Sequence, residues 1–177
     1  PPPYPYVALC ASGGHTSLYL VESDTALRLL GRTLDDAAGE AFDKAAKLLG
    51  LGYPGGPVID RVARDGDRNA VRFPIGLRRK SSLDFSFSGL KTSLRVHVER
   101  NGLTGGESLA DLCASFQEAI VATLVRKTVS AARGLQCPTV VVAGGVALNS
   151  RLREAFREAC SENDLSLHLT PPALCGD

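Results

Sequence analysis

Residues 6–30 have the sequence YVALCASGGHTSLYLVESDTALRLL, which contains three short apolar runs separated by turn residues. The runs cover residues 6–11, 18–21 and 27–30. Between them stand Ser12-Gly13-Gly14-His15 and then Glu22-Ser23-Asp24, both rich in turn-forming residues. Short apolar runs joined by tight turns predict three neighbouring strands of an antiparallel meander.

A helix is predicted directly after the meander, over residues 37–49. Asp35 and Asp36 precede it as candidate N-terminal caps, and Gly50 follows it as a stop. Two pairs on this helix have the acidic residue first at i,i+4 spacing, namely Glu40–Lys44 and Asp43–Lys47. Such pairs stabilise an exposed helix edge, so one side of the helix is expected to face solvent.

The middle of the chain, residues 51–107, is expected to be an insertion because its patterns are shorter and less regular. Pro57 suits the first turn of a short helix that ends near Gly66. Residues 84–88 alternate as a strand does, and residues 90–99 suit another helix.

The last third of the chain returns to strong patterns. Residues 108–133 are the clearest predicted helix, since Leu112, Phe116, Ile120 and Leu124 recur every four residues. The elements predicted after it are a strand over 139–142, a helix over 149–160 and a strand over 165–170.

The order of these elements is that of an α/β ribonuclease-H-like lobe of the actin-like ATPase superfamily, which includes sugar kinases and heat-shock ATPases. The insertion would be helical. We expect residues 1–177 to be one such lobe, made of a meander plus helix (6–50), the insertion (51–107) and a helix-strand-helix-strand segment (108–177). The chain contains no methionine, and neither end resembles a natural terminus. A lobe truncated at both ends, cut from a longer protein, is therefore expected.

Composition excludes several classes of protein. The net charge is +1, from 20 basic and 19 acidic residues, which argues against a polycationic or polyacidic protein. No apolar run approaches the roughly 20 residues that a membrane span needs. The five cysteines are scattered with no C-x-x-C pair, which argues against a zinc ribbon or a secreted disulfide scaffold. Reduced thiols in the cytoplasm fit this pattern.

Two Gly-Gly turns each follow a predicted strand. Ser12-Gly13-Gly14-His15 joins two strands, and Gly144-Gly145 joins a strand to a helix. Glycine lets the backbone come within hydrogen-bond range of a phosphate, and a helix start adds partial positive charge. Either pair taken alone is more typical of a plain tight turn. Neither is a G-x-G-x-x-G or Walker A loop, which disfavours those two nucleotide-binding classes.

Other polar residues have a structural reading beside a functional one. Asp43 could accept hydrogen bonds from ribose hydroxyls or form a salt bridge with Lys47. Asn149 could contact a ligand or cap the following helix, and spacing alone favours the structural role for both. Pro54-Gly55-Gly56 could face a ligand or simply link two helices.

The basic residues and the histidines give weaker indications of nucleic-acid binding and of metal binding. The basic residues of 61–80 could neutralise nucleic-acid phosphates, or they could form a solvated face. The three histidines, His15, His97 and His168, lack the i,i+4 spacing that places two imidazoles on one metal. His97 is expected on the surface of a helix. A complete metal site within this chain is not expected.

Six stretches of the chain carry a resemblance: ASGGHT (11–16), TLDDAAGEAFDK (33–44), YPGGP (53–57), DFSFSGLKT (84–92), ASFQE (114–118) and VAGGVALNSRLR (142–153). Together they resemble the bacterial tRNA adenosine threonylcarbamoyltransferases, the TsaD family, once classed as O-sialoglycoprotein endopeptidases. The stretches follow in order over nearly the whole chain, which makes the match much more specific than any single motif.

The resemblance implies an actin-like two-lobed fold and a role in tRNA modification. Members transfer a threonylcarbamoyl group from threonylcarbamoyl-AMP to N6 of the adenosine at position 37 of tRNAs reading codons that begin with A. In bacteria a paralogous partner subunit and a small ATPase assist. A cytoplasmic location without a membrane partner is implied.

The resemblance also implies residue roles. The loop that contacts the adenylate, or ATP or AMP in its place, matches Cys10, Ala11, Ser12, Gly13 and Gly14. Asp43, Gly56 and Asn149 match further ligand contacts, and Asp60 matches an acidic position that in many members helps to hold the ribose. No nucleophile or base is identified, because the adenosine amine itself attacks an activated carbamoyl carbon.

One divalent metal, iron or zinc, is implied for the whole protein. Asp177 falls where the family's metal-binding aspartate stands, although it follows Cys175-Gly176 and the family has Cys-Thr there. The two metal histidines of the family, in a His-x-x-x-His helix, precede the first strand, and this chain begins after them. We therefore expect the 177 residues alone to be catalytically inactive.

Three alternatives stand beside the transferase. The first is a non-catalytic module of the same family that binds an adenylate or a partner; the retention of Asp43, Asn149 and Asp177 disfavours it. The second is the historical metalloendopeptidase, which would want an H-E-x-x-H pair that is absent from the chain. The third is a sugar kinase, for which no residue specifies the catalytic aspartate base.

Overall fold

A mixed five-stranded sheet forms the centre of the computed structural model, which describes residues 2–75, 82–102 and 108–175. The strands are β1 (Tyr6–Ala11), β2 (Thr16–Val21), β3 (Leu27–Arg32), β4 (Thr139–Ala143) and β5 (Ser166–Leu169). Their order across the sheet is β3-β2-β1-β4-β5. The first three are antiparallel, whereas β4 runs parallel to β1 and β5 parallel to β4. The predicted meander is therefore confirmed.

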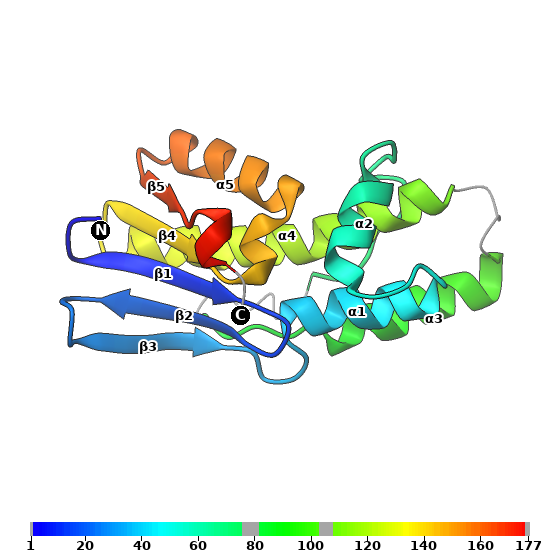
Figure 1. The fold of residues 1–177 in the computed structure, drawn as a ribbon, viewed down its shortest axis with the longest axis horizontal. Coiled ribbons are helices and arrows are strands. Elements are labelled where there is room, and N and C mark those ends of the chain that lie inside the picture. The colour runs from blue at the N-terminus through cyan, green and yellow to red at the C-terminus, as the bar shows by residue number, and fades with distance from the viewer. Residues whose placement is uncertain (1, 76–81, 103–107, 176–177) are drawn as a thin grey trace.

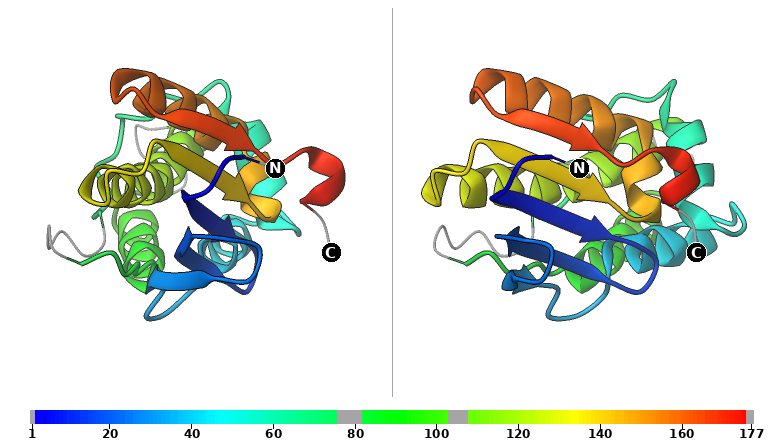
Figure 2. Two further views of the ribbon diagram at one scale, coloured as in Figure 1. Left: turned by 90° about the vertical axis from the view of Figure 1, so that its left-hand side faces the viewer. Right: turned by 60° about the vertical axis from the view of Figure 1, so that its left-hand side comes forward.

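Five helices and two short 3-10 segments are described around this sheet. They are α1 (Ala38–Leu48), α2 (Gly55–Ala63), α3 (Ser88–Asn101), α4 (Leu109–Gly134), η1 (Gly145–Leu148), α5 (Ser150–Glu162) and η2 (Pro172–Leu174). Figures 1 and 2 show α4 along one face of the sheet and α1, α2 and α3 gathered beyond one end of its strands. Because the arrows of β1 and β4 point toward that cluster, it lies at the carboxyl ends of the two central strands.

The long helix α4 forms the spine of the core, as its apolar period predicts. Leu112, Phe116, Ile120 and Leu124 are all buried, and α4 contacts α2, α5, β1 and β4. Burial of a large apolar side chain contributes about 1.5–3 kcal/mol, so this stripe is a main source of stability. Within the described ranges no helix is both long and apolar enough to cross a membrane.

The insertion is part of the same packed core. Its helices α2 and α3 contact α1, and α2 also packs on α4. Helix α2 begins at Gly55 after Pro54 at its N-cap position, so Pro57 lies in the first turn as predicted. The division into segments 6–50, 51–107 and 108–177 stays a prediction.

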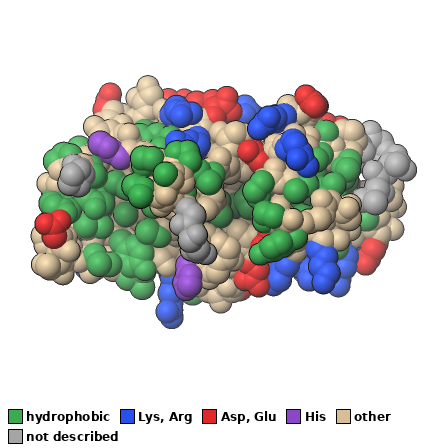
Figure 3. Space-filling model, viewed as in Figure 1, with side chains coloured by type: hydrophobic (Ala, Val, Ile, Leu, Met, Phe, Trp, Pro, Cys, Tyr) green, Lys and Arg blue, Asp and Glu red, His purple; other side chains and the backbone are tan. Residues whose placement is uncertain are grey.

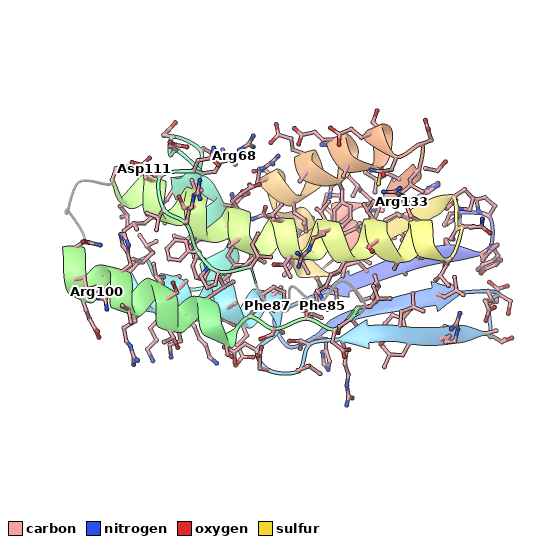
Figure 4. The ribbon with its side chains drawn as sticks, turned by 180° about the vertical axis from the view of Figure 1, so that it is seen from behind. Arg68, Phe85, Phe87, Arg100, Asp111 and Arg133 are labelled. Carbon is pink, nitrogen blue, oxygen red and sulfur yellow. The ribbon has the colours of Figure 1, made fainter. Side chains whose placement is uncertain are left out.

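Residues 84–88 do not form the predicted strand. Phe85 makes only an isolated bridge to Thr33, and helix α3 begins at Ser88. Phe85 and Phe87 are both buried and stack on each other, with ring centroids 6.2 Å apart. Figure 4 labels the two side chains between α3 and the meander. The alternation therefore reflects two buried phenylalanines in an extended segment, not sheet pairing.

The predicted caps of α1 are wrong. Ala37 occupies its N-cap position and makes no side-chain cap bond. Asp35 instead caps α3, accepting hydrogen bonds from the backbone N–H groups of Phe87 at 2.8 Å and Ser88 at 3.2 Å. Asp36 pairs with Lys44 at 2.6 Å. Sequence proximity suggested the wrong helix because Asp35 acts across 52 residues of chain.

Asp35 gives stability a dependence on pH. Burial alone would raise the pKa of its carboxyl, but hydrogen bonds from Ser86, Phe87 and Ser88 hold the pKa below its ordinary value. A lowered folded-state pKa contributes stability above the unfolded value of about 3.9, and this is lost as pH falls through the folded pKa.

Replacement of Asp35 by Asn is expected to lower stability at neutral pH by about 1 kcal/mol, the usual cost of a weakened cap. The variant should also lose less stability than the parent on acidification. Urea unfolding at pH 7 and pH 3.5 tests both statements. A parent and variant with the same acid dependence would show that Asp35 is not the group responsible.

His97 is half-buried, so its predicted surface position is wrong. Its ring meets Phe73 edge-on with centroids 6.2 Å apart, and its Nδ1 lies 3.3 Å from the Asn101 amide nitrogen. Phe73 also packs edge-on against Phe116 of α4, so His97 lies at the margin of this aromatic cluster. His15 and His168 are exposed.

Candidate functional site

The two Gly-Gly turns meet at one edge of the sheet. Strands β1 and β4 are parallel with Cys10 opposite Ala143, so the turns that follow them lie side by side. Gly144 makes the closest approach: a Cβ built there would lie 2.3 Å from the carbonyl oxygen of Ala11. Its φ of 92° and ψ of 169° lie in a region that is essentially glycine-only. A glycine is therefore required at position 144, where the chain leaving β4 passes close to the end of β1.

The turn after β1 is closed on itself and covered by the start of α1. Within the turn, Ser12 N–H donates to the His15 carbonyl at 2.8 Å. The first N–H groups of α1 are occupied by this loop, since Gly39 donates to the Ser12 carbonyl at 3.1 Å and Ala38 to Thr16 Oγ1 at 2.9 Å. The positive end of α1 is thus satisfied by protein groups.

Gly13 and Gly14 are the open part of the turn. Both are exposed, and a Cβ built on either would meet no atom within 4 Å. Among the described residues no hydrogen bond is found for either backbone N–H. Two adjacent N–H groups without acceptors in the described part of the chain can donate to a phosphate or carbonyl oxygen of a ligand.

Asp43 links α1 to the start of α2. Its Oδ1 accepts a hydrogen bond from the Gly55 N–H at 2.7 Å. The predicted Asp43–Lys47 salt bridge is not found among the described residues, whereas the Glu40–Lys44 pair is confirmed at 2.9 Å. Asp43 therefore has a structural role that spacing did not suggest. Its second carboxylate oxygen, Oδ2, takes no part in this hydrogen bond.

The Tyr53–Pro57 turn packs tightly on one side only. A Cβ on Gly55 would lie 2.5 Å from the Phe42 carbonyl oxygen, whereas a Cβ on Gly56 would meet no atom within 4 Å. Gly55 is thus required by the α1–α2 contact. Gly56 is open on its outer side, and its contact with a ligand stays a prediction.

Asp60 and Asn149 both stabilise the beginning of α5. The Asp60 carboxylate accepts hydrogen bonds from the Ser150 N–H at 3.1 Å and the Ser150 hydroxyl at 2.7 Å. Asn149 Oδ1 accepts from the Leu152 N–H at 2.9 Å, which confirms the predicted cap. Asn149 Nδ2 donates to Gln117 Oε1 at 2.6 Å, and Asn149 is only 8% exposed.

These contacts form a closed circuit, which we call the contact ring. It runs from the turn 12–15 to α1, through Asp43 to the start of α2, through Asp60 to the start of α5, and back through η1 and Gly144 to the strands. The ring carries all the predicted contact residues that the structure describes: Cys10, Ala11, Ser12, Gly13, Gly14, Asp43, Gly56, Asp60 and Asn149. Figure 3 shows basic and acidic side chains mixed along the upper edge of the molecule.

A cleft opens beside the contact ring between α2, α4 and α5. Its volume is about 360 Å³, and its lining includes Asp60, Gln117 and Ser150. Arg151 at its wall is held by Glu118 at 2.8 Å and Glu154 at 2.8 Å, and these bonds raise its pKa further above an already high value. Part of the cleft wall is therefore formed by paired charges of α4 and α5.

Cys10 is the one cysteine among the named residues of the ring. A cysteine acts as a nucleophile in its thiolate form. Burial raises the pKa of the Cys10 thiol, so it stays protonated near neutral pH. This fits a site that binds and orients its ligand rather than attacking it.

The candidate metal ligand and part of the basic stretch lie outside the described residues. Asp177 lies outside the described residues. Within 2–75, 82–102 and 108–175 no group of three His, Cys, Asp or Glu side chains could hold a metal ion. Arg61, Arg64, Arg68 and Arg72 are exposed, which suits a solvated face and a nucleic-acid face equally. Arg78, Arg79 and Lys80 lie outside the described residues.

Three residues of the ring were not singled out from the sequence. Gly39 allows α1 to reach the turn, since a Cβ there would lie 2.5 Å from the Ser12 carbonyl oxygen. Ser150 binds Asp60, and Gln117 binds Asn149. Of the three, only Gln117 could have been noticed from the sequence, because it is a polar amide among the apolar positions of the long helix.

A known protein family matches the chain over its whole length. The model of the family described as "TsaD: tRNA N6-adenosine threonylcarbamoyltransferase" matches residues 1–177. The chain belongs to the TsaD family. A tRNA N6-adenosine threonylcarbamoyltransferase of Syntrophus aciditrophicus is 58% identical over 99% of this chain and 52% of its own length. Another, from Anaeromyxobacter sp., is 57% identical over 99% of this chain and 53% of its own length. The chain thus spans about half the length of these TsaD relatives.

Solved structures share the fold at low identity. The crystal structure of HypF from T. kodakarensis superposes with a TM-score of 0.62 at 23% identity, covering 86% of this chain and 19% of that one. The activator of 2-hydroxyisocaproyl-CoA dehydratase from Clostridium difficile, with bound ADPNP, gives 0.54 at 16% identity, covering 96% and 55%. These likenesses confirm the predicted actin-like α/β fold class of this TsaD chain and nothing about its ligands.

Proposed function

We propose that this chain is part of a transferase that moves the threonylcarbamoyl group of threonylcarbamoyl-AMP onto N6 of the adenosine at position 37 of tRNAs reading codons that begin with A. The amine nitrogen forms a bond to the carbamoyl carbon, the bond from that carbon to the AMP oxygen breaks, and the amine loses a proton. AMP and the modified adenosine are the products. Family membership and the names of the relatives support this reaction.

The observation that carries the proposal is the contact ring. Residues matched to adenylate contacts come from β1 and its turn, α1, α2 and the start of α5, and hydrogen bonds of Ser12, Asp43 and Asp60 join these neighbouring segments. A ring of this kind fixes the donor in one orientation, which lowers the entropic part of the barrier. No protein nucleophile is required, because the adenylate is already activated.

Each part of the ring offers a distinct group to the donor. The free N–H groups of Gly13 and Gly14 suit a phosphate or carbamoyl oxygen. Asp43 Oδ2 suits a ribose hydroxyl, and the remaining hydrogen on Asn149 Nδ2 suits an acceptor on the nucleoside. Asp60 already binds Ser150 through both oxygens. A carboxylate has about four acceptor sites, so it can accept a ribose hydroxyl as well.

A divalent metal, iron or zinc, belongs to the proposal for the whole protein. When bound, it would polarise the carbamoyl carbonyl. Asp177 is this chain's candidate ligand, and the described residues supply no further ligand set. We also propose a cytoplasmic protein that acts on tRNA with a paralogous partner subunit and a small ATPase.

Reconstitution with purified components tests the function. The full-length protein, mixed with its partners, threonylcarbamoyl-AMP and unmodified tRNA, should yield threonylcarbamoyladenosine by mass spectrometry of nuclease digests. The 177 residues alone should yield none, because the proposed metal histidines are missing. Product from the isolated chain would refute the claim of inactivity. Tight AMP binding without transfer by the full-length protein would favour the non-catalytic module.

Substitution of Gly14 by Ala should separate binding from folding. The new methyl group meets no protein atom within 4 Å, so unfolding free energy should change by no more than about 1 kcal/mol. It would project into the space assigned to the ligand and should weaken adenylate binding at least about tenfold. Calorimetric titration and thermal melting measure the two quantities. Unchanged affinity would mean that the ligand does not approach this turn.

A further inference from the structure

Gln117 connects the long helix α4 to a candidate ligand contact, Asn149, through a hydrogen bond. It lies in α4, is only 4% exposed, and lines the cleft beside Asp60 and Ser150. Its Oε1 accepts the 2.6 Å hydrogen bond from Asn149 Nδ2. A buried amide in an apolar helix costs free energy unless it is hydrogen-bonded, so its presence at this point calls for a reason.

The amide of Asn149 has only one orientation that satisfies its neighbours. The Leu152 backbone N–H is a donor and cannot accept, so it must face Asn149 Oδ1. Nδ2 is thereby directed to Gln117, which must offer its oxygen. One Nδ2 hydrogen is used by Gln117, and the second is left as a donor.

We infer that Gln117 is a positioning residue: it holds the Asn149 amide so that the second Nδ2 hydrogen donates to the bound adenylate. This inference rests on the proposed function, because Asn149 is a ligand contact only there. Without the Gln117 acceptor the Asn149 side chain keeps its cap on α5 but gains freedom about its terminal torsion. Affinity for the nucleotide should then fall although Gln117 itself touches no ligand atom.

Four variants of the full-length protein isolate this effect. Gln117→Met keeps the length of the side chain but removes the acceptor, and Gln117→Glu keeps an acceptor oxygen. Asn149→Asp keeps the cap oxygen but removes both Nδ2 hydrogens. Thr123→Val, on the same helix, removes a buried hydroxyl that bonds only the Ala119 carbonyl at 2.8 Å, and serves as the control.

The affinity of each variant for AMP is measured by calorimetric titration, with thermal melting as a check on folding. Gln117→Met should lose about tenfold in affinity, the usual worth of one oriented hydrogen bond. Gln117→Glu and Thr123→Val should stay within about threefold of the parent. In the Asn149→Asp background, Gln117→Met should cause no further loss, because its route to the ligand is gone.

Several results would overturn the inference. Equal losses from Gln117→Met in both backgrounds would show that Gln117 acts without Asn149, as would a loss in Gln117→Glu as large as in Gln117→Met. If Gln117→Met does not fold, Gln117→Leu and Gln117→Glu are compared in its place against the same predictions. A parent protein that binds no AMP or threonylcarbamoyl-AMP would refute the proposed function and the inference together, whereas parental binding with additive losses refutes the inference alone.

Discussion

Asp43→Asn in the full-length protein is expected to weaken binding of AMP and threonylcarbamoyl-AMP by about ten- to a hundredfold. Hydrogen bonds to a charged group contribute about 1.5–3 kcal/mol, which corresponds to this range of affinity. The substitution separates the two roles of the side chain. Asn keeps an oxygen for the Gly55 N–H, now bonded at 2.7 Å, but replaces Oδ2 by an amino group that cannot accept from a ribose hydroxyl.

Calorimetric titration measures the affinity. Two further variants show whether a loss of affinity comes from the ligand contact or from a change in the structure. Asp43→Ala removes both roles and should lose at least as much affinity, together with some thermal stability at the α1–α2 contact. Glu40→Gln, one turn earlier on the same helix, weakens the pair with Lys44, keeps an oxygen for the Ala37 N–H, and should leave affinity unchanged. Equal affinity of Asp43→Asn and the parent would leave Asp43 as a purely structural link.

Much of the fold could be predicted because local patterns coincide with tertiary structure. The apolar period of Leu112, Phe116, Ile120 and Leu124 is buried along α4, and the runs joined by Ser12–His15 pair as expected. The failures came from contacts that act at a distance along the chain. Asp35 capped a helix that begins 53 positions later, and Phe85 and Phe87 alternated for packing without a strand partner.

The site was predictable in part for the same reason. The resemblance and the order of the motifs predicted residues that the structure places on neighbouring segments, and their contacts with a ligand stay a prediction. The hydrogen bonds that join these residues could not be predicted. Asp60 meets Ser150 across 90 positions and Gln117 meets Asn149 across 32, separations that no local pattern encodes. Spacing favoured a Lys47 partner for Asp43, while the fold supplied the Gly55 backbone.

Gly144→Ala should be the most destabilising of the glycine substitutions at the site. The new Cβ would lie 2.3 Å from the Ala11 carbonyl oxygen and 2.8 Å from its carbonyl carbon. Both atoms belong to the backbone of Ala11, which is held at the end of β1 by pairing with Thr16 of β2 and by the neighbouring pair Cys10–Ala143, so they cannot easily move aside. A strained φ costs about 1–3 kcal/mol and forced overpacking a similar amount, so a loss of roughly 3 kcal/mol is expected. For a chain of this size that lowers Tm by about 6–12 °C.

Gly145→Ala, the neighbouring residue, is the matched control. Its Cβ would lie 3.7 Å from the nearest atom, the Cys175 carbonyl oxygen, which is ordinary contact, and its φ is not positive. Differential scanning calorimetry of the two variants should show a large drop for the first and little change for the second. Equal melting temperatures would mean that the β1–β4 seam relaxes around a side chain at position 144. The glycine pair would then be kept for its ligand rather than for its fold.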